Sequence, residues 1–340
     1  MKRFGFPQEL ACILAGALVL AVVPAFVQDS YQRHLLIMVF VYGIVASSWD
    51  LSLGYGGVFN FGHLALFGVG LYTYGLLTKL LGLDPWLGLL AGGAAAVLAA
   101  ALIAVPILRL KGIYIVLVSF AFSQLLLQLV ISESDITGGN SGLVRVPMLK
   151  IPGHNMVRDH KLGFYYIALA LLLCSTIFLR GLVRSALGRS IVALRDNEEY
   201  AVSRGVSLGR QRLITLGASA LFTGIAGAFY GGYFRNASTD VFGMGLTTLA
   251  LSMVLLGGRA TIYGALLAAF LLTFLSEAIA DYGVWRPIVI GVLIIAVMLV
   301  YPGGLAAAVA AVARRLTALF RGAPPEPAAQ GNAVQTKVSS

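Results

Sequence analysis

The segment Arg180–Arg212, RGLVRSALGRSIVALRDNEEYAVSRGVSLGRQR, decides the fold class because it is strongly basic and lies between two apolar runs. It holds seven arginines and three acidic residues, in a chain of which only 11% of the residues are charged. The flanking runs, Phe164–Leu179 and Leu213–Phe234, approach or reach the roughly 20 residues that a helix needs to cross a bilayer. A charged segment between two such runs predicts a water-facing loop of a membrane protein.

The composition of the whole chain agrees with that interpretation. The 340 residues are 59% hydrophobic and include 40 glycines, and the mean hydropathy is +0.89. A soluble domain is closer to ~45–50% apolar and ~25% charged. The net charge of +10 would raise nucleic acid as a partner of a soluble protein. Here the basic residues fall between apolar runs, so membrane topology and anionic lipid headgroups explain them better, and we expect no nucleic-acid partner.

Apolar runs of near-spanning length recur along the chain and predict an all-α, polytopic integral membrane protein with about ten transmembrane helices. The runs are Leu10–Val27, Leu35–Leu53, His63–Gly82, Trp86–Leu108, Ile113–Ile131, Phe164–Leu179, Leu213–Phe234, Val241–Leu256, Thr261–Ala280 and Arg286–Tyr301. We expect one transmembrane domain over residues 1–321. The tail Gly322–Ser340 has three prolines and few large apolar residues, which predicts a disordered cytoplasmic tail.

The loop charges predict the orientation. If the N-terminus is cytoplasmic, every basic cluster falls on the cytoplasmic side, and the nearly neutral segment Ser132–Gly163 falls outside. Both termini are then cytoplasmic. The first run also resembles a signal peptide, with Val23–Ala25 as a cleavage site. Its 18 residues exceed a usual signal core, which favours an uncleaved anchor.

Two glycine-rich segments interrupt the apolar pattern: Gly54–His63, defined here as the first break, and Gly257–Gly264, the second break. Irregular backbone at membrane depth must line a cavity or pack on protein, and paired interruptions in two halves of a chain point to a transport pathway. The alternative is that the glycines only permit tight turns or close helix packing. The pathway candidates in the breaks are Gly54, Gly56, Gly57, Gly62, His63, Gly257 and Gly258.

Polar residues inside apolar runs add further candidates. Asp50 and His63 flank the first break, and an ionisable group within a span is costly unless it has a role or a partner. The fifth run carries two polar pairs, Ser119 with Ser123 and Gln124 with Gln128, on different helix faces. One pair is expected to face the pathway and the other a neighbouring helix, and Gln124 joins the pathway candidates.

The sequence contains no catalytic constellation. It has no Gly-x-x-x-x-Gly-Lys-Ser/Thr phosphate loop, no His-Glu-x-x-His metal motif and no Gly-x-Ser-x-Gly nucleophile turn. The two cysteines lie in apolar runs and give no disulfide framework. We therefore predict that the chain is not an enzyme and has no catalytic, cofactor or metal residues. Any ATP would be used by another chain.

Five motifs resemble a known family, the permease subunits of branched-chain amino acid ABC transporters of the LivM type. They occur in the family's order from about Leu53 to Leu305. The motifs are the glycine-rich Leu53–Gly57 with Phe61–His63 and Phe67–Thr73, then Arg109–Tyr114, Thr137–Leu143, Gly188–Arg212 and Tyr301–Leu305. No single motif is decisive, but together they are specific.

The resemblance implies a multi-pass permease of the bacterial inner membrane. It implies four kinds of partner in addition to the lipid bilayer: a second, similar permease, two ABC ATPase subunits that use ATP, and a periplasmic substrate-binding protein. The implied substrates are branched-chain amino acids, with urea, amides and other amino acids left open. Gln124 and Leu127 depart from the family, where Glu and Arg are expected.

The resemblance also implies a site for coupling to the ATPases. Such permeases carry a Glu-Ala-Ala-x-x-x-Gly loop that docks on the ATPase. Here Glu199, Ala201 and Gly205 have that spacing, Tyr200 replaces the first Ala, and Arg195 precedes them in the same segment. A plain topology signal is the alternative interpretation of this basic loop.

Two other classes of function remain. A stand-alone secondary transporter driven by an ion gradient would need ionisable groups at mid-membrane, and only Asp50 and Glu277 come close. An integral membrane enzyme would need the catalytic set that the sequence lacks.

Overall fold

The computed structural model describes residues 6–27, 29–150, 161–283, 285–301, 303–309 and 311. These residues fold almost entirely into helices, which confirms the predicted all-α class. The two short strands, β1 (Leu143–Val144) and β2 (Asn236–Ala237), pair antiparallel with Leu143 opposite Ala237. The predicted tail Gly322–Ser340 lies outside the described residues.

Within the described residues, six apolar helices are long enough to cross a membrane. They are α1 (Phe6–Phe26), α2 (Ser30–Asp50) with its continuation η1 (Leu51–Tyr55), α4 (Pro85–Ile107), α5 (Ile113–Ser132), α7 (Leu162–Arg184) and α10 (Leu208–Phe234). The other four predicted spans form shorter or less apolar helices. These are α3 (His63–Leu80), α11 (Met244–Gly257), α12 (Ile262–Ala278) and α13 (Trp285–Val300).

Most predicted span boundaries differ from the observed helix ends by a few residues, as two examples show. The predicted span Val241–Leu256 begins as a 3-10 turn, η3 (Thr239–Phe242), because the hydroxyl of Ser238 accepts the amide hydrogen of Asp240 over 3.2 Å and caps that turn. The span predicted as Phe164–Leu179 is longer in the structure, because helix α7 continues through the charged residues as far as Arg184.

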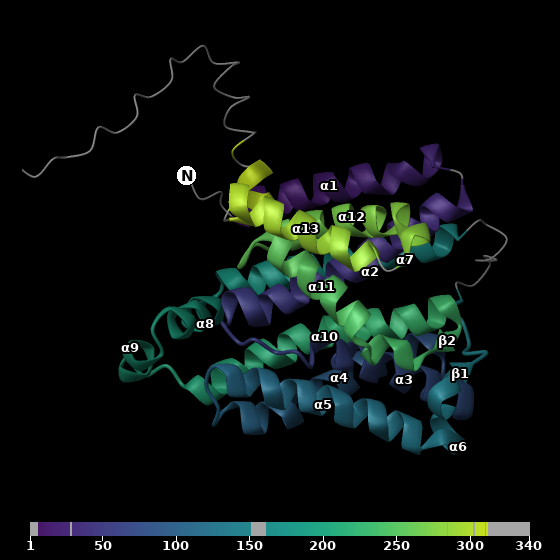
Figure 1. Ribbon diagram of the computed structural model, residues 1–340, viewed down its shortest axis with the longest axis horizontal. Coiled ribbons are helices and arrows are strands. Elements are labelled where there is room, and N and C mark those ends of the chain that lie inside the picture. The colour runs from purple at the N-terminus through teal and green to yellow at the C-terminus, as the bar shows by residue number, and fades with distance from the viewer. Residues whose placement is uncertain are drawn as a thin grey trace, which may run out of the picture.

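Helix α10 lies at the centre of the bundle, against α2, α3 and α4, while α2 also packs on α7, α11 and α12 (Figure 1). Small residues let the central helices approach closely. A Cβ on Gly70 of α3 would collide with the carbonyl of Gly224 in α10, and one on Gly227 would collide with the carbonyl of Phe67. The core is therefore set by backbone-to-backbone contact as well as by apolar side chains.

The helices run back and forth between two ends. One end, called the basic end below, carries α8 (Ala186–Asp196) and α9 (Glu198–Ser203), and there Glu9 of α1 contacts Arg180 of α7 and Tyr263 of α12. The other end carries β1, β2 and the short helix α6 (Ser134–Thr137), as Figure 1 shows. The short helix η2 (Gly139–Ser141) connects α6 to β1.

This arrangement separates the two segments that the charge pattern places on opposite sides of the membrane. The basic segment Arg180–Arg212 lies at one end, and the described part of Ser132–Gly163 lies at the other (Figure 1). That the basic end faces the cytoplasm stays a prediction.

Candidate functional site

The predicted coupling segment, Gly188–Arg212, spans two short helices followed by a glycine turn. The Ser185 hydroxyl accepts the Gly188 amide hydrogen at the start of α8, and the Asn197 side chain accepts the Tyr200 amide hydrogen over 2.9 Å at the start of α9. After α9, Gly205 has φ +85°, and the amide of Val206 donates to the carbonyl of Ala201 over 3.1 Å. The left-handed conformation suits glycine. A helix (α9), a glycine break at Gly205 and a second helix (α10) therefore follow one another here.

The first break folds back along the end of α2. After η1, Gly57 takes φ +65°, and the amide of Val58 donates to the carbonyl of Ser52 over 2.9 Å. The chain then runs without helix until His63 begins α3. The predicted irregular backbone is thus confirmed, and it packs on protein as the bilayer requires.

Arg195 of the coupling segment touches this break directly. Its Nη1 donates to the carbonyl oxygen of Gly54 over 2.8 Å. A Cβ on Gly57 would lie 2.8 Å from Arg195 Cγ, so the arginine stem lies against the glycine backbone. The same guanidinium is held from the other side by Asp196, which accepts from Nη2 over 2.7 Å. The structure therefore joins a predicted coupling residue to two predicted pathway residues, Gly54 and Gly57.

The two breaks also meet each other. The carboxylate oxygen Oδ1 of Asp50 accepts the amide hydrogen of Ala260 over 2.8 Å, and Asp50 is fully buried. A Cβ on Gly54 would collide with both Asp50 and Ala260. Gly54 thus needs glycine for close approach, and one carboxylate fastens the first break to the second.

The second break is packed as closely as the first. Gly258 has φ +97°, and a Cβ there would collide with the carbonyl oxygen of Gly303 in the turn after α13. A Cβ on Gly257 would lie 2.5 Å from the amide nitrogen of Ala265. Close contact of backbone therefore explains both glycines, which is the packing alternative weighed above.

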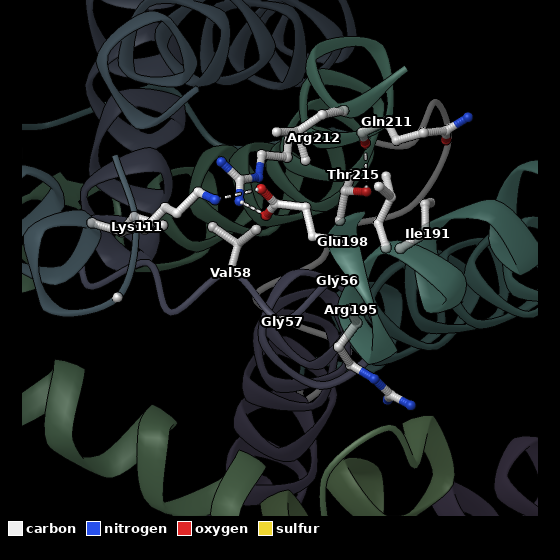
Figure 2. Close-up of a pocket in the computed structure, with 14 residues that line it drawn as sticks. Gly56, Gly57, Val58, Lys111, Ile191, Arg195, Glu198, Gln211, Arg212 and Thr215 are labelled. Carbon is white, nitrogen blue, oxygen red and sulfur yellow. Dashed lines mark hydrogen bonds and ion pairs between the residues drawn. The ribbon is translucent and has the colours of Figure 1, made fainter. Parts of the chain in front are cut away.

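A cavity of about 310 Å³ opens between the first break, the coupling segment and the start of α10 (Figure 2). At one wall Glu198 of α9 pairs with Lys111 Nζ over 3.2 Å and with Arg212 Nη2 over 3.0 Å. Arg212 also donates to the carbonyl of Ile107 over 3.3 Å. Glu198 thus ties the coupling segment to the turn between α4 and α5. Sequence reasoning missed it, although its opposite charge within a basic loop was a usable signal.

His63 lies deep inside the bundle and is fully buried. Its Nε2 is 2.8 Å from the hydroxyl of Thr223 on α10, and its ring stacks on Trp49 at 5.2 Å between centroids. Just before it, the amide of Phe61 donates to the hydroxyl of Ser119 over 2.9 Å. His63 and its neighbours therefore hold the start of α3 against α2, α5 and α10. Thr223 has no sequence signal, because threonine is common in such helices.

Gln124 is the one pathway candidate that the structure leaves apart from the breaks. It is half-buried on α5, with Gln128 exposed one turn further on, whereas Ser119 and Ser123 are buried. The two polar pairs thus face different surroundings, as expected. Among the described residues, no hydrogen bond joins Gln124 to either break.

The outer surface of the coupling segment is unusual for a water-facing loop. Glu199 is exposed, and Tyr200 and Val202 of α9 are 59% and 47% exposed. Arg204 lies over the Tyr200 ring at 5.3 Å. Ala201, by contrast, is only 3% exposed. Ala201 therefore anchors α9 on this chain, whereas Glu199, Tyr200 and Val202 face outward.

Comparison with known proteins places this helical bundle in a class. The sequence model of the family described as branched-chain amino acid transport system, permease component, matches residues 33–300. That range contains both breaks and the coupling segment. The chain belongs to this family of membrane transport permeases.

Individual relatives agree. The chain is 28% identical over 313 residues to the high-affinity branched-chain amino acid transport system permease protein LivM of Escherichia coli, covering 86% of this chain and 74% of that protein. The corresponding LivM of Salmonella typhimurium is equally similar. A probable branched-chain amino acid transport permease protein LivM of Methanocaldococcus jannaschii is 25% identical over 255 residues, covering 64% of this chain and 72% of the relative. No solved structure matches the chain.

Proposed function

We propose that this chain is the inner-membrane permease subunit of an ABC importer and that α8 and α9 couple it to separate ATPase subunits. The permease role follows from the family. The coupling role rests on one observation above the others: Arg195 of the coupling segment donates to the Gly54 carbonyl in the first break.

In the proposed mechanism, a movement is transmitted through a series of residue contacts. ATP binding closes two ATPase subunits, which move α9 through its exposed residues Glu199, Tyr200 and Val202. Because Arg195 is hydrogen-bonded to the Gly54 carbonyl, that movement reaches the end of α2 and the first break. The hydrogen bond between Asp50 and the Ala260 amide then transmits the movement to the second break. Both breaks shift together, and the pathway alternates between outward-open and inward-open.

The ion-pair cluster gives the same segment a second attachment. Glu198 pairs with Lys111 and Arg212, so a displaced α9 also pulls on the turn between α4 and α5. Since α5 carries Gln124, this second route reaches the pathway candidate that lies apart from the breaks. The two attachments would move different walls of one pathway.

The proposed substrate class is branched-chain amino acids or related small solutes, because the named relatives transport branched-chain amino acids. The proposed assembly adds a second homologous permease, two ATPases and a periplasmic binding protein. Both termini are proposed to be cytoplasmic, because the basic residues then fall inside.

A stand-alone ion-coupled transporter is the competing function, and its candidate carriers are Asp50 and Glu277. Asp50 lies near the basic end of α2, where it already accepts the Ala260 amide hydrogen. Glu277 lies at the opposite end, where it accepts the Tyr31 hydroxyl over 2.6 Å. Their positions favour structural roles over a shared mid-membrane ion site.

The test is import of radiolabelled leucine into proteoliposomes that contain this permease with its partner permease, the ATPases and the binding protein. With ATP enclosed and no ion gradient, we expect uptake that disappears when the ATPases or the binding protein are left out. Uptake by this chain alone, driven by a proton or sodium gradient, would replace the importer with the secondary transporter.

A further inference from the structure

A large apolar groove runs between α1, α7 and α12. Helix α1 lies at the edge of the bundle (Figure 1). Its volume is about 1070 Å³. Its walls are apolar side chains for most of their length, including Ile13 and Leu20 from α1, Leu169 and Leu173 from α7, and Leu266 from α12. In a membrane-spanning bundle, such a groove is filled by acyl chains or by another helix.

The groove becomes polar toward the basic end. Arg184 and Glu9 line it there, and Arg180 stands one turn before Arg184 on the same helix. Both guanidinium groups pair with the Glu9 carboxylate, and the Tyr263 hydroxyl donates to it over 3.0 Å. Among the described residues at this end of the groove, these two positive charges face one negative charge, which leaves a net charge of +1.

A buried hydroxyl stands between the apolar and the charged parts. Thr176 lines the groove and is 4% exposed, and among the described residues its Oγ1 has no hydrogen-bond partner. A buried hydroxyl normally has one. Thr176, Arg180 and Arg184 follow at intervals of four residues, so they share one face of α7.

The side-chain types along this face of α7 follow the order of the parts of a phospholipid. Leucines come first, then a single hydroxyl, then guanidinium groups, which suit acyl chains, a glycerol ester and a phosphate in turn. Basic pockets between helices on the cytoplasmic side recognise anionic headgroups. We propose that this groove is a specific site for one anionic phospholipid of the leaflet at the basic end, which is cytoplasmic in the predicted orientation, with the acyl chains along the leucines and Arg184 facing the phosphate.

The site is tested by filling the groove without changing its charge. Gly16 lines it, and a Cβ built there meets no atom within 4 Å, so Gly16→Phe occupies the groove and not the core. Gly291 of α13 has the same open surroundings and lies outside the groove, which makes Gly291→Phe the matched control. The whole transporter is purified in mild detergent, and bound phospholipid is counted by native mass spectrometry.

We expect one phosphatidylglycerol per copy of this chain in the wild type and in Gly291→Phe, and none in Gly16→Phe. In a second arm, delipidated transporter is titrated with phosphatidylglycerol or phosphatidylethanolamine. Arg184→Gln should lower the preference for phosphatidylglycerol by about fivefold, whereas Arg189→Gln, an exposed arginine outside the groove, should not.

Three results would overturn the site: no retained lipid in the wild type, equal retention in Gly16→Phe, or no change of preference in Arg184→Gln. If Gly16→Phe releases the second permease, as the same spectrum would show, a partner helix fills the groove and the lipid assignment is wrong. None of these readouts measures transport, so they test the lipid site independently of the proposed function.

Discussion

Arg195 and Gly54 lie 141 residues apart in the sequence, and a hydrogen bond of 2.8 Å joins the guanidinium of one to the carbonyl of the other. The donor belongs to a short helix of the basic loop, and the acceptor belongs to the place where α2 loses regular helix. A charged donor on a backbone acceptor contributes roughly 1.5–3 kcal/mol. In the proposed coupling route, this contact is the link between the loop and the bundle.

Replacing Arg195 should separate ATP hydrolysis from transport. Arg195→Gln loses the charged donor to Gly54, and we expect leucine transported per ATP hydrolysed to fall by about tenfold, since ~1.4 kcal/mol corresponds to a factor of ten. Arg210→Gln, an exposed arginine in the same segment, is the control and should keep the wild-type ratio. An unchanged ratio in Arg195→Gln would remove this bond from the coupling route.

Asp50 offers a test of whether its bond or its charge matters. Asp50→Asn keeps an oxygen that can accept the Ala260 amide hydrogen, whereas Asp50→Ala leaves that hydrogen without this partner. An unpaired buried donor costs about 1–3 kcal/mol. We expect Asp50→Ala to lower the thermal midpoint and transport, and Asp50→Asn to keep most of both. Loss of transport in Asp50→Asn at normal stability would instead favour the ion-coupled transporter.

The elements of the fold were predictable from the sequence because they depend on local composition. Apolar runs predicted the helices, and glycine pairs predicted both breaks. The contacts between elements were not predictable in this way. Ala260 meets Asp50 across 210 residues, and no periodicity or spacing encodes that approach. Thr223 was missed for the same reason, since its partner His63 comes from another helix. Glu198 carried a charge signal, but the sequence did not indicate its partner Lys111 in the turn between α4 and α5.

Gly258 should tolerate no side chain, whereas Gly217 of α10 should tolerate one. A Cβ on Gly258 would collide with the carbonyl of Gly303, and its φ of +97° is strained for other residues. We expect Gly258→Ala to destabilise the permease by at least ~1–3 kcal/mol. Gly217→Ala on α10 is the control, since its Cβ would lie 3.8 Å from the nearest side chain. The measurement is the thermal midpoint of the purified complex, and equal midpoints would contradict the packing argument.

The two ends of the bundle should face opposite sides of the membrane. Ser203 is exposed at the end of α9, and Ser141 is exposed in η2 at the other end. Single cysteines at these positions, in a chain without Cys12 and Cys174, should react with a membrane-impermeant maleimide from opposite sides. Ser141→Cys should label in intact cells and Ser203→Cys only after lysis. Labelling of both in intact cells would refute the predicted topology.

A substitution at Gly205 should test docking of the ATPase without unfolding the permease. Its φ is +85°, and a Cβ built there meets no atom within 4 Å, so the space beside it is open in this chain. Asp is among the residues that tolerate positive φ best, and the strain is about 1–2 kcal/mol. Gly205→Asp should therefore leave the permease folded in the membrane. If an ATPase docks on α9, the added carboxylate enters that contact, and ATPase retention should fall at least tenfold, as ~1.4 kcal/mol of lost contact requires.

Gly82→Asp is the matched control, because Gly82 also has positive φ (+63°) and open surroundings but lies between α3 and α4 at the opposite end. Retention is read from co-purification together with substrate-stimulated ATP hydrolysis. If Gly205→Asp and Gly82→Asp retain the ATPase equally, α9 is not the docking contact, and the basic segment is a topology signal.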